Sequence, residues 1–251
     1  MKLSIQFGSL LFIFILTSCQ KPQRTAGLCL SLDDRSIKAW YSLRPIFKEY
    51  DAKVTFFVTQ FDSLSAEEIV LLKELQQDGH EIASHGAMHV QAEKYIKENS
   101  YRDYFANEIK PSIASMKKSG FTPTAFAYPY GSKYWFTDFM LLHQFKVTRG
   151  VSAIDQKNGV ATQDEVFYAF DGNKKILAAE IDHLSGLTKP MVTRAMDRAL
   201  QQKEVLLLCG HEPSVSNQSA YFFDVDFLKF ILEQAKLRHL KFYSASELII
   251  N

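Results

Sequence analysis

The chain has 251 residues, a formal net charge of +1 and 47% hydrophobic residues. This length can bury one large core, as in an α/β barrel, and does not require two domains. The balanced charge and the absence of a basic stripe argue against nucleic acid as a partner.

The first 18 residues have the pattern of a secretory signal peptide. Lys2 gives a positive start, and the apolar run at 10–16 is shorter than the roughly 20 residues that span a bilayer. The run leads into Leu16-Thr17-Ser18-Cys19, which resembles a bacterial lipobox and implies cleavage before Cys19 and lipidation of its thiol. An ordinary signal peptide and an uncleaved anchor are the alternatives. We expect a signal peptide over 1–18, a lipidated Cys19 with a tether over 19–26, and an exported lipoprotein anchored to a membrane, namely the outer membrane on its periplasmic side.

From Gly27 onward, predicted strands and helices alternate. Short apolar or β-branched runs predict strands, and apolar residues spaced three or four apart predict helices. The predicted strands cover 28–32, 54–58, 81–84, 125–128, 145–148, 176–181, 205–209 and 241–243. The predicted helices cover 36–50, 65–75, 100–118 with a kink or a new start at Pro111, a segment ending at 141, 188–200 and 224–237. This alternation implies a parallel sheet, while residues 150–173 show no clear pattern.

Polar side chains suited to catalysis directly follow several of these strands. Asp33 and Asp34 follow the first strand. His85 and His89 follow the third, and His211 follows the most apolar late strand. In α/β barrels, the C-terminal ends of the strands form the active-site face. We therefore expect these five residues to meet in one site, although each pair alone is also typical of a solvated loop or a helix face.

One carboxylate and two imidazoles four residues apart suit a transition-metal ion. Asp34, His85 and His89 are predicted to hold one divalent metal ion, with Zn²⁺ as the first choice and Co²⁺, Ni²⁺ or Mn²⁺ as alternatives. The three cysteines include no CxxC pair, which excludes a cysteine-based zinc knuckle. Cys29 and Cys209 are most simply buried thiols, and a disulfide between them stays open.

The chain from Gly27 to its C-terminus resembles the polysaccharide deacetylases of carbohydrate esterase family 4, the NodB-homology domain. Four motifs in the family's order carry the resemblance: Ser31-Leu32-Asp33-Asp34, His85-Gly86-Ala87-Met88-His89, Tyr128-Pro129-Tyr130-Gly131 and Leu208-Cys209-Gly210-His211. The resemblance implies one catalytic domain over 27–251, a single distorted (β/α) barrel with about seven parallel strands. It also implies that Asp33 is the general base, that Asp34 and the two histidines bind the metal, and that His211 is the general acid. The third motif would form the site wall and offer a backbone N–H to the oxyanion.

Several positions depart from the family pattern. Ala127 occupies the place where many members have an arginine that tethers the base, so Asp33 needs another cationic neighbour. Arg35 or Arg149 could supply it. A cysteine replaces the leucine that lines the acetyl pocket, and the family's Asp-x-x-Asp-Trp motif has no clear counterpart. The candidate oxyanion and substrate-binding residues are Pro129, Tyr130, Trp135, Arg149 and Cys209.

These features favour a metal-dependent hydrolase that removes acetyl groups from an N-acetylated carbohydrate, such as a GlcNAc-containing polysaccharide, an oligosaccharide or peptidoglycan. The alternatives are an O-acetyl esterase of the xylan type on the same scaffold and a catalytically weak, glycan-binding lipoprotein. A serine esterase is disfavoured because no GxSxG motif occurs. The expected partners are an acetylated carbohydrate and, through Cys19, a membrane.

Overall fold

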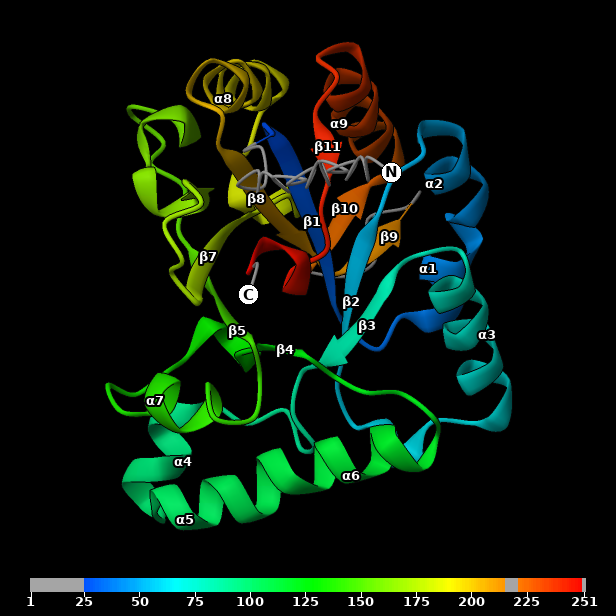
Figure 1. Cartoon of the computed structure of the whole chain (residues 1–251), viewed down its shortest axis with the longest axis vertical. Coiled ribbons are helices and arrows are strands. Elements are labelled where there is room, and N and C mark those ends of the chain that lie inside the picture. Colours follow the sequence, from blue (N-terminus) through cyan, green and yellow to red (C-terminus); the bar gives the residue numbers. More distant parts are fainter. Residues whose placement is uncertain (1–24, 215–220, 250–251) are drawn as a thin grey trace, which may run out of the picture.

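The computed structural model describes residues 25–214 and 221–249, which form a barrel of parallel strands surrounded by helices (Figure 1). In order around the barrel, the strands are β1 (Gly27–Asp34), β2 (Val54–Val58), β3 (Glu81–Ser84), β4 (Ala125–Ala127), β5 (Val147–Ser152), β7 (Lys175–Glu180) and β8 (Val205–Gly210). β8 pairs with β1 in parallel, which closes the barrel. The predicted fold class, a (β/α) barrel of seven parallel strands, is confirmed.

Short strands extend the barrel sheet and form a second, small sheet. β11 (Lys241–Phe242) lies parallel to β1, and β6 (Phe167–Tyr168) lies antiparallel to β8. β9 (Glu212–Ser214) and β10 (Phe222–Asp224) pair with each other directly after the end of β8. This small sheet begins next to His211, so it lies beside the predicted acid.

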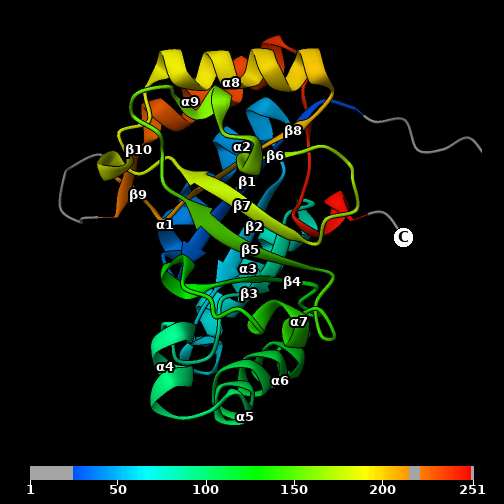
Figure 2. The same cartoon turned by 90° about the vertical axis from the view of Figure 1, so that its left-hand side faces the viewer.

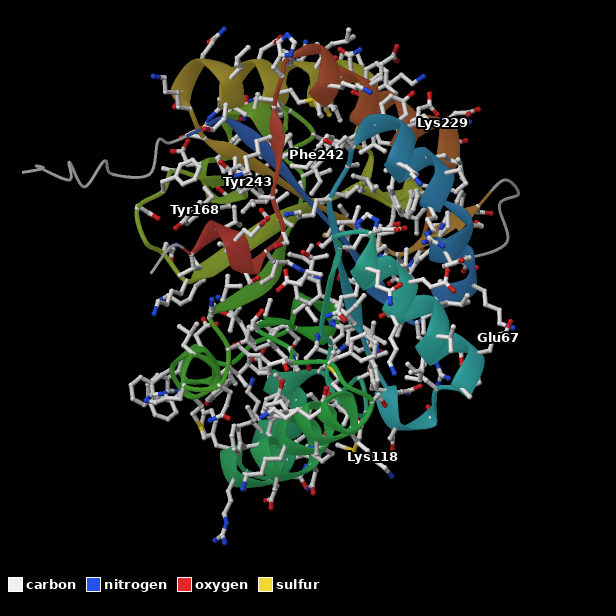
Figure 3. The ribbon with its side chains drawn as sticks, turned by 45° about the vertical axis from the view of Figure 1, so that its right-hand side comes forward. Glu67, Lys118, Tyr168, Lys229, Phe242 and Tyr243 are labelled. Atoms are coloured by element: carbon white, nitrogen blue, oxygen red, sulfur yellow. The ribbon has the colours of Figure 1, made fainter. Side chains whose placement is uncertain are left out.

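Helices gather at two opposite ends of the molecule (Figures 1 and 2). One group is α4 (Ala92–Glu98), α5 (Tyr101–Tyr104) and α6 (Lys110–Lys118), and the opposite group is α8 (Lys189–Gln202) and α9 (Val225–Leu237). The other helices are α1 (Ile37–Ser42), α2 (Arg44–Tyr50), α3 (Ala66–Gln77) and α7 (Thr137–Leu141). Glu67 on α3 and Lys229 on α9 point away from the barrel, as expected for the solvent faces of amphipathic helices (Figure 3).

Two of the predicted helices are divided in the structure. The stretch 36–50 breaks at Leu43, and Pro45 lies in the first turn of the new helix, α2, where proline is tolerated. The stretch 100–118 comprises α5, a π-helical turn at Phe105–Ile109 and α6, and Pro111 lies in the first turn of α6 as predicted. Helix α4 was not predicted.

Alternation along the barrel strands decides which side chains reach the interior. Cys29 packs inside the barrel, so Asp33, four residues later on the same strand, lies on the inner face as well. Val147 also packs inside, and Arg149 is two residues further along β5. The predicted fifth strand ended too early, at 148, whereas β5 continues to Ser152. Arg149 is therefore a buried strand residue rather than one at the strand end.

The signal segment and Cys19 lie outside the described residues, so the structure does not test them. Within residues 25–214 and 221–249, no helix combines the length and the apolar character needed to cross a membrane. Cys29 and Cys209 are both buried free thiols, so no disulfide joins them.

Candidate active site

Asp34, His85 and His89 converge at the C-terminal ends of β1 and β3, the two strands that flank β2. Asp34 is the last residue of β1, and the two histidines lie in the loop that follows β3. Asp34 Oδ1 lies 3.0 Å from His89 Nε2 and 3.4 Å from His85 Nε2. Burial by itself would raise the pKa of Asp34, but the two imidazoles outweigh it and hold this pKa well below its usual range. Asp34 is therefore an anion facing two imidazole nitrogens.

The tautomer of His85 is fixed by the strand next to it. His85 Nδ1 lies 2.9 Å from the carbonyl oxygen of Ala127, which can only accept, so Nδ1–H donates and Nε2 carries the lone pair in the neutral ring. Metal-binding histidines usually have such a partner behind them, because it holds the ring and fixes the tautomer. The backbone of Ala127 thus takes part in the site although its side chain has no polar group.

The three residues fit a divalent metal ion. Ligand atoms about 2.1 Å from a tetrahedral metal ion are about 3.4 Å apart, close to the separations of Asp34 Oδ1 from the two Nε2 atoms. Asp34 Oδ1 is buried and makes no well-aligned hydrogen bond within the described residues, as expected of an atom that binds a cation. The donor set of one carboxylate and two imidazoles suits Zn²⁺ and related transition metals.

Asp33 lies beside the three candidate metal ligands and forms an ion pair inside the barrel. Its Oδ2 accepts a hydrogen bond from Arg149 Nη2, and both side chains are almost completely buried. Its Oδ1 has no partner among the described residues. Arg35 instead donates to Ser63 and Gln60. Of the two arginines considered for the missing tether, the structure therefore brings Arg149 to Asp33.

His211 has a carboxylate partner of its own on β7's C-terminal side. His211 Nδ1 donates to Asp182 Oδ2 at 2.5 Å, and the backbone N–H of His211 donates to Asp182 Oδ1 at 3.1 Å. Burial alone would lower the pKa of His211, but the hydrogen bond to Asp182 and the charges of Asp33 and Asp34 raise it to about 9. Nδ1 is occupied, so a protonated His211 has Nε2–H to donate. The indole N–H of Trp40 donates to the carbonyl oxygen of His211 and fixes the backbone there.

A cavity of about 550 Å³ joins the two groups. Its lining residues are Asp33, Asp34, His85, His89, Tyr128, Tyr130, Gly131, Val151, Ala153, Glu180, His211 and Tyr221. All five residues predicted to form the centre of the site, the two aspartates and the three histidines, therefore share one cavity. Tyr130 lies at the rim, 62% exposed, with its ring centroid 4.7 Å from that of His89.

The other predicted substrate-binding residues lie outside this lining. Trp135 is 80% exposed on the surface, and Cys209 is fully buried. Pro129 is buried, and Arg149 is buried against Asp33. Contacts of these four residues with a substrate stay a prediction.

Three acidic residues near the site were not predicted. Glu180 and Asp182 lie at the C-terminal end of β7 next to His211, and Glu108 accepts hydrogen bonds from the loop that carries His85 and His89. Glu180 and Asp182 lie at the end of the predicted strand 176–181 in the same way that Asp33 and Asp34 follow the first strand, so the same signal could have found them. Glu108 has no comparable sequence signal.

The polysaccharide deacetylase family model matches residues 20–141. This part of the chain belongs to the polysaccharide deacetylase family. The match includes Asp33, Asp34, His85 and His89 and ends before Arg149. No curated protein is significantly similar to the chain in sequence.

Similarity in fold to solved structures extends over nearly the whole chain. Peptidoglycan deacetylase PdaC from Bacillus subtilis is 17% identical over 89% of this chain and 90% of its own, with a TM-score of 0.55. The Xyl-CE4 domain of a xylanase from the hindgut metagenome of Trinervitermes trinervoides is 16% identical over 89% of each chain, with a TM-score of 0.54. BA3943, a CE4 family pseudoenzyme from Bacillus anthracis, is 13% identical over 90% of this chain and 66% of its own, with a TM-score of 0.57. At these identities, the likeness is one of fold.

Proposed function

We propose that the protein is a metal-dependent hydrolase that removes acetyl groups from an N-acetylated carbohydrate. One observation carries the proposal: the cavity that contains Asp34, His85 and His89 is also lined by Asp33 and His211. A binding protein would need a cation site or polar contacts, but not a carboxylate and a protonated imidazole that both face the same ligand. Membership of the polysaccharide deacetylase family supports the substrate class.

The cavity walls suggest how an acetylated sugar would lie. Val151 and Ala153 line the cavity and offer an apolar surface for the acetyl methyl group, in place of the buried Cys209. The exposed ring of Tyr130 at the rim can stack on a pyranose. A second depression of about 340 Å³ shares His89 and Tyr130 with the cavity and continues along α4. This continuity favours an oligomeric or polymeric glycan over a single sugar.

The first proton transfer is assigned to Asp33. Arg149 holds one carboxylate oxygen and leaves Oδ1 free to accept a proton from the attacking water. A divalent metal ion held by Asp34, His85 and His89 would polarise the acetyl oxygen and acidify the water. Arg149 also places a positive charge against Asp33 inside the barrel, where an unpaired carboxylate would be costly.

The second proton transfer is assigned to His211. The water oxygen bonds to the acetyl carbon, the C–N bond breaks, and the amine nitrogen must take up a proton as it leaves. With a pKa raised to about 9, the imidazole is protonated at neutral pH, and its Nε2–H can supply that proton. Asp182 stabilises the charged ring throughout.

The test is acetate release from chito-oligosaccharides, peptidoglycan and acetylxylan, with and without a chelator. We expect chelator-sensitive release from an N-acetylated substrate. Release from acetylxylan alone would favour the O-acetyl esterase instead. Absence of release from every substrate by metal-loaded protein would contradict an enzymatic role and favour glycan binding.

We also propose that Cys19 anchors the protein to a membrane, from the lipobox-like tetrad that precedes it. Labelling of cells with a fatty-acid analogue should mark the wild-type protein and fail for Cys19→Ser. Cys29→Ser is the matched control, because that thiol is buried. Equal labelling of wild type and Cys19→Ser would disprove the anchor.

A further inference from the structure

A buried carboxylate holds the loop that carries His89. Glu108 is completely buried and lies in the π-helical turn between α5 and α6. Its Oε2 accepts the backbone N–H of Ala87 at 3.1 Å and that of Met88 at 2.6 Å. Its Oε1 accepts the N–H of Val90 at 3.3 Å. The carboxylate therefore binds the backbone on both sides of His89.

The two histidines differ in what holds them. His85 directly follows β3, its backbone N–H donates to Val58, and its ring donates to Ala127. Within the described part of the chain, the ring of His89 donates to no carbonyl; it faces Asp34 and packs against Tyr130. The backbone of His89 has φ +60°, a region that residues other than glycine rarely adopt. Such a conformation persists only when the surroundings impose it.

The loop and the carboxylate fit each other closely. Gly86 has φ +83°, and a Cβ on this residue would collide with the carboxylate of Glu108. The π-helical turn that carries Glu108 is a rare conformation that is frequent at functional sites. Ala87 N–H also donates to the backbone carbonyl of Glu108 at 3.1 Å, so the turn and the loop are joined twice.

We propose that Glu108 is a positioning residue for the metal site: by binding the backbone of Ala87, Met88 and Val90 it sets the orientation of the His89 ring. The inference rests on the proposed function, because it takes Asp34, His85 and His89 as the metal ligands. Loss of an outer partner that orients a ligand typically lowers metal affinity by about 10–100-fold. We expect the loss of Glu108 to lower metal affinity by a factor in that range, which is smaller than the effect of removing His89 itself.

The experiment compares Glu108→Gln with Glu247→Gln. The amide nitrogen that the first substitution introduces cannot accept a hydrogen bond, so the change disturbs the three backbone donors without opening a cavity. Glu247 is the matched control, since its carboxylate accepts the backbone N–H of Ser244 at 2.9 Å but lines no part of the cavity. The measurements are the Zn²⁺ dissociation constant by competition with a chromophoric chelator, the visible spectrum of the Co²⁺ form, and the melting temperature.

We expect Glu108→Gln to raise the Zn²⁺ dissociation constant about 10–100-fold and to change the Co²⁺ spectrum, and Glu247→Gln to change neither. A folded Glu108→Gln with the wild-type constant and spectrum would overturn the inference. If Glu108→Gln does not fold, Gly86→Ala is measured in its place. Its added methyl group displaces the Glu108 carboxylate from the side of the loop, and the same two outcomes apply. Failure of the wild type to bind metal would overturn the metal site itself, which separates that result from a failure of Glu108 alone.

Discussion

Up to Leu141, the candidate metal ligands and the base come from two short motifs: Asp33 is next to Asp34, and His85 and His89 are four residues apart. Beyond Leu141, the site residues come from separate strands and pair with residues that are distant in the sequence. Arg149 on β5 pairs with Asp33, 116 residues away, and Asp182 pairs with His211, 29 residues away. The two regions also differ in what they supply, because the first holds the metal ligands and the second sets the charge of the groups that move protons.

This difference predicts a separation of effects. Changes in the region beyond Leu141 should alter the rate, its pH dependence and the stability of the charge pairs, and leave the metal content unchanged. Changes at His85 or His89 should remove the metal and, with it, the activity. The predictions below test this separation, from the largest expected effect to the smallest.

The largest effect is expected for the two proton-transfer residues. Asp33→Asn and His211→Ala should each lower kcat by about 10²–10⁴-fold, the usual loss when one general acid or base is removed. An activated ester, whose leaving group needs no proton, should restore His211→Ala far more than Asp33→Asn. Equal failure of both variants on that ester would show that His211 is not the acid.

Of the two arginine substitutions considered, the one that breaks the ion pair inside the barrel should cause the larger loss of stability. Arg149→Met leaves the buried Asp33 without its cation, which should lower the free energy of unfolding by about 3–5 kcal/mol. Arg35→Met is the control, since Arg35 makes only exposed and half-buried hydrogen bonds and should cost about 0.5 kcal/mol or less. Urea denaturation of both variants measures the difference, and similar costs would show that the Asp33 pair contributes little.

Asp182 should control the pH dependence of the acid. The rate should fall as pH rises through about 9, where His211 loses its proton. Asp182→Asn removes the negative partner, so this alkaline limb should move to lower pH by roughly one to three pH units, with an unchanged metal content. An alkaline limb that stays in place in the pH–rate profile would show that another group limits the rate there.

A second buried histidine, in the region before Leu141, should respond to pH in the opposite direction. His80 Nδ1 accepts the Val54 N–H at 3.1 Å, and burial lowers the pKa of His80 to about 4. The folded state therefore binds a proton at His80 less readily than the unfolded state does. The stability linked to this histidine is fully present above the unfolded pKa of about 6.5 and is lost as pH falls toward 4. For His211, whose folded pKa is raised, stability is present below about 6.5 and is lost as pH rises through about 9.

His80→Gln keeps an acceptor for Val54 without the titration. The loss of unfolding free energy between pH 6.5 and pH 4 should become smaller by up to about 3 kcal/mol. Thermal denaturation across this range measures it. An identical pH dependence in wild type and His80→Gln would assign the acid sensitivity to other groups.

The same contrast between regions explains what could be predicted from the sequence. The alternation of strands and helices and the central site residues follow from strand runs that end in polar side chains, and both features are local. The barrel of about seven strands is implied by the family resemblance. The pairing of Arg149 with Asp33 depends on β5 continuing past Thr148 and on the closure of the barrel, which no local pattern shows. Glu108 could not be predicted, because its role depends on the π-helical turn and on the loop it meets in space. Trp135 shows a different limit of sequence analysis. Its position close to the third motif does not predict how far its side chain lies from the cavity.

The most direct test of the central claim is the metal content of purified protein, measured for three forms in parallel. The wild type and His211→Ala should each contain about one equivalent of divalent metal, and the His85→Ala/His89→Ala double variant should contain almost none. This result would place the metal ligands before Leu141 and would show that His211, beyond it, is not one of them. Full metal occupancy in the double variant, or loss of metal in His211→Ala, would contradict the account.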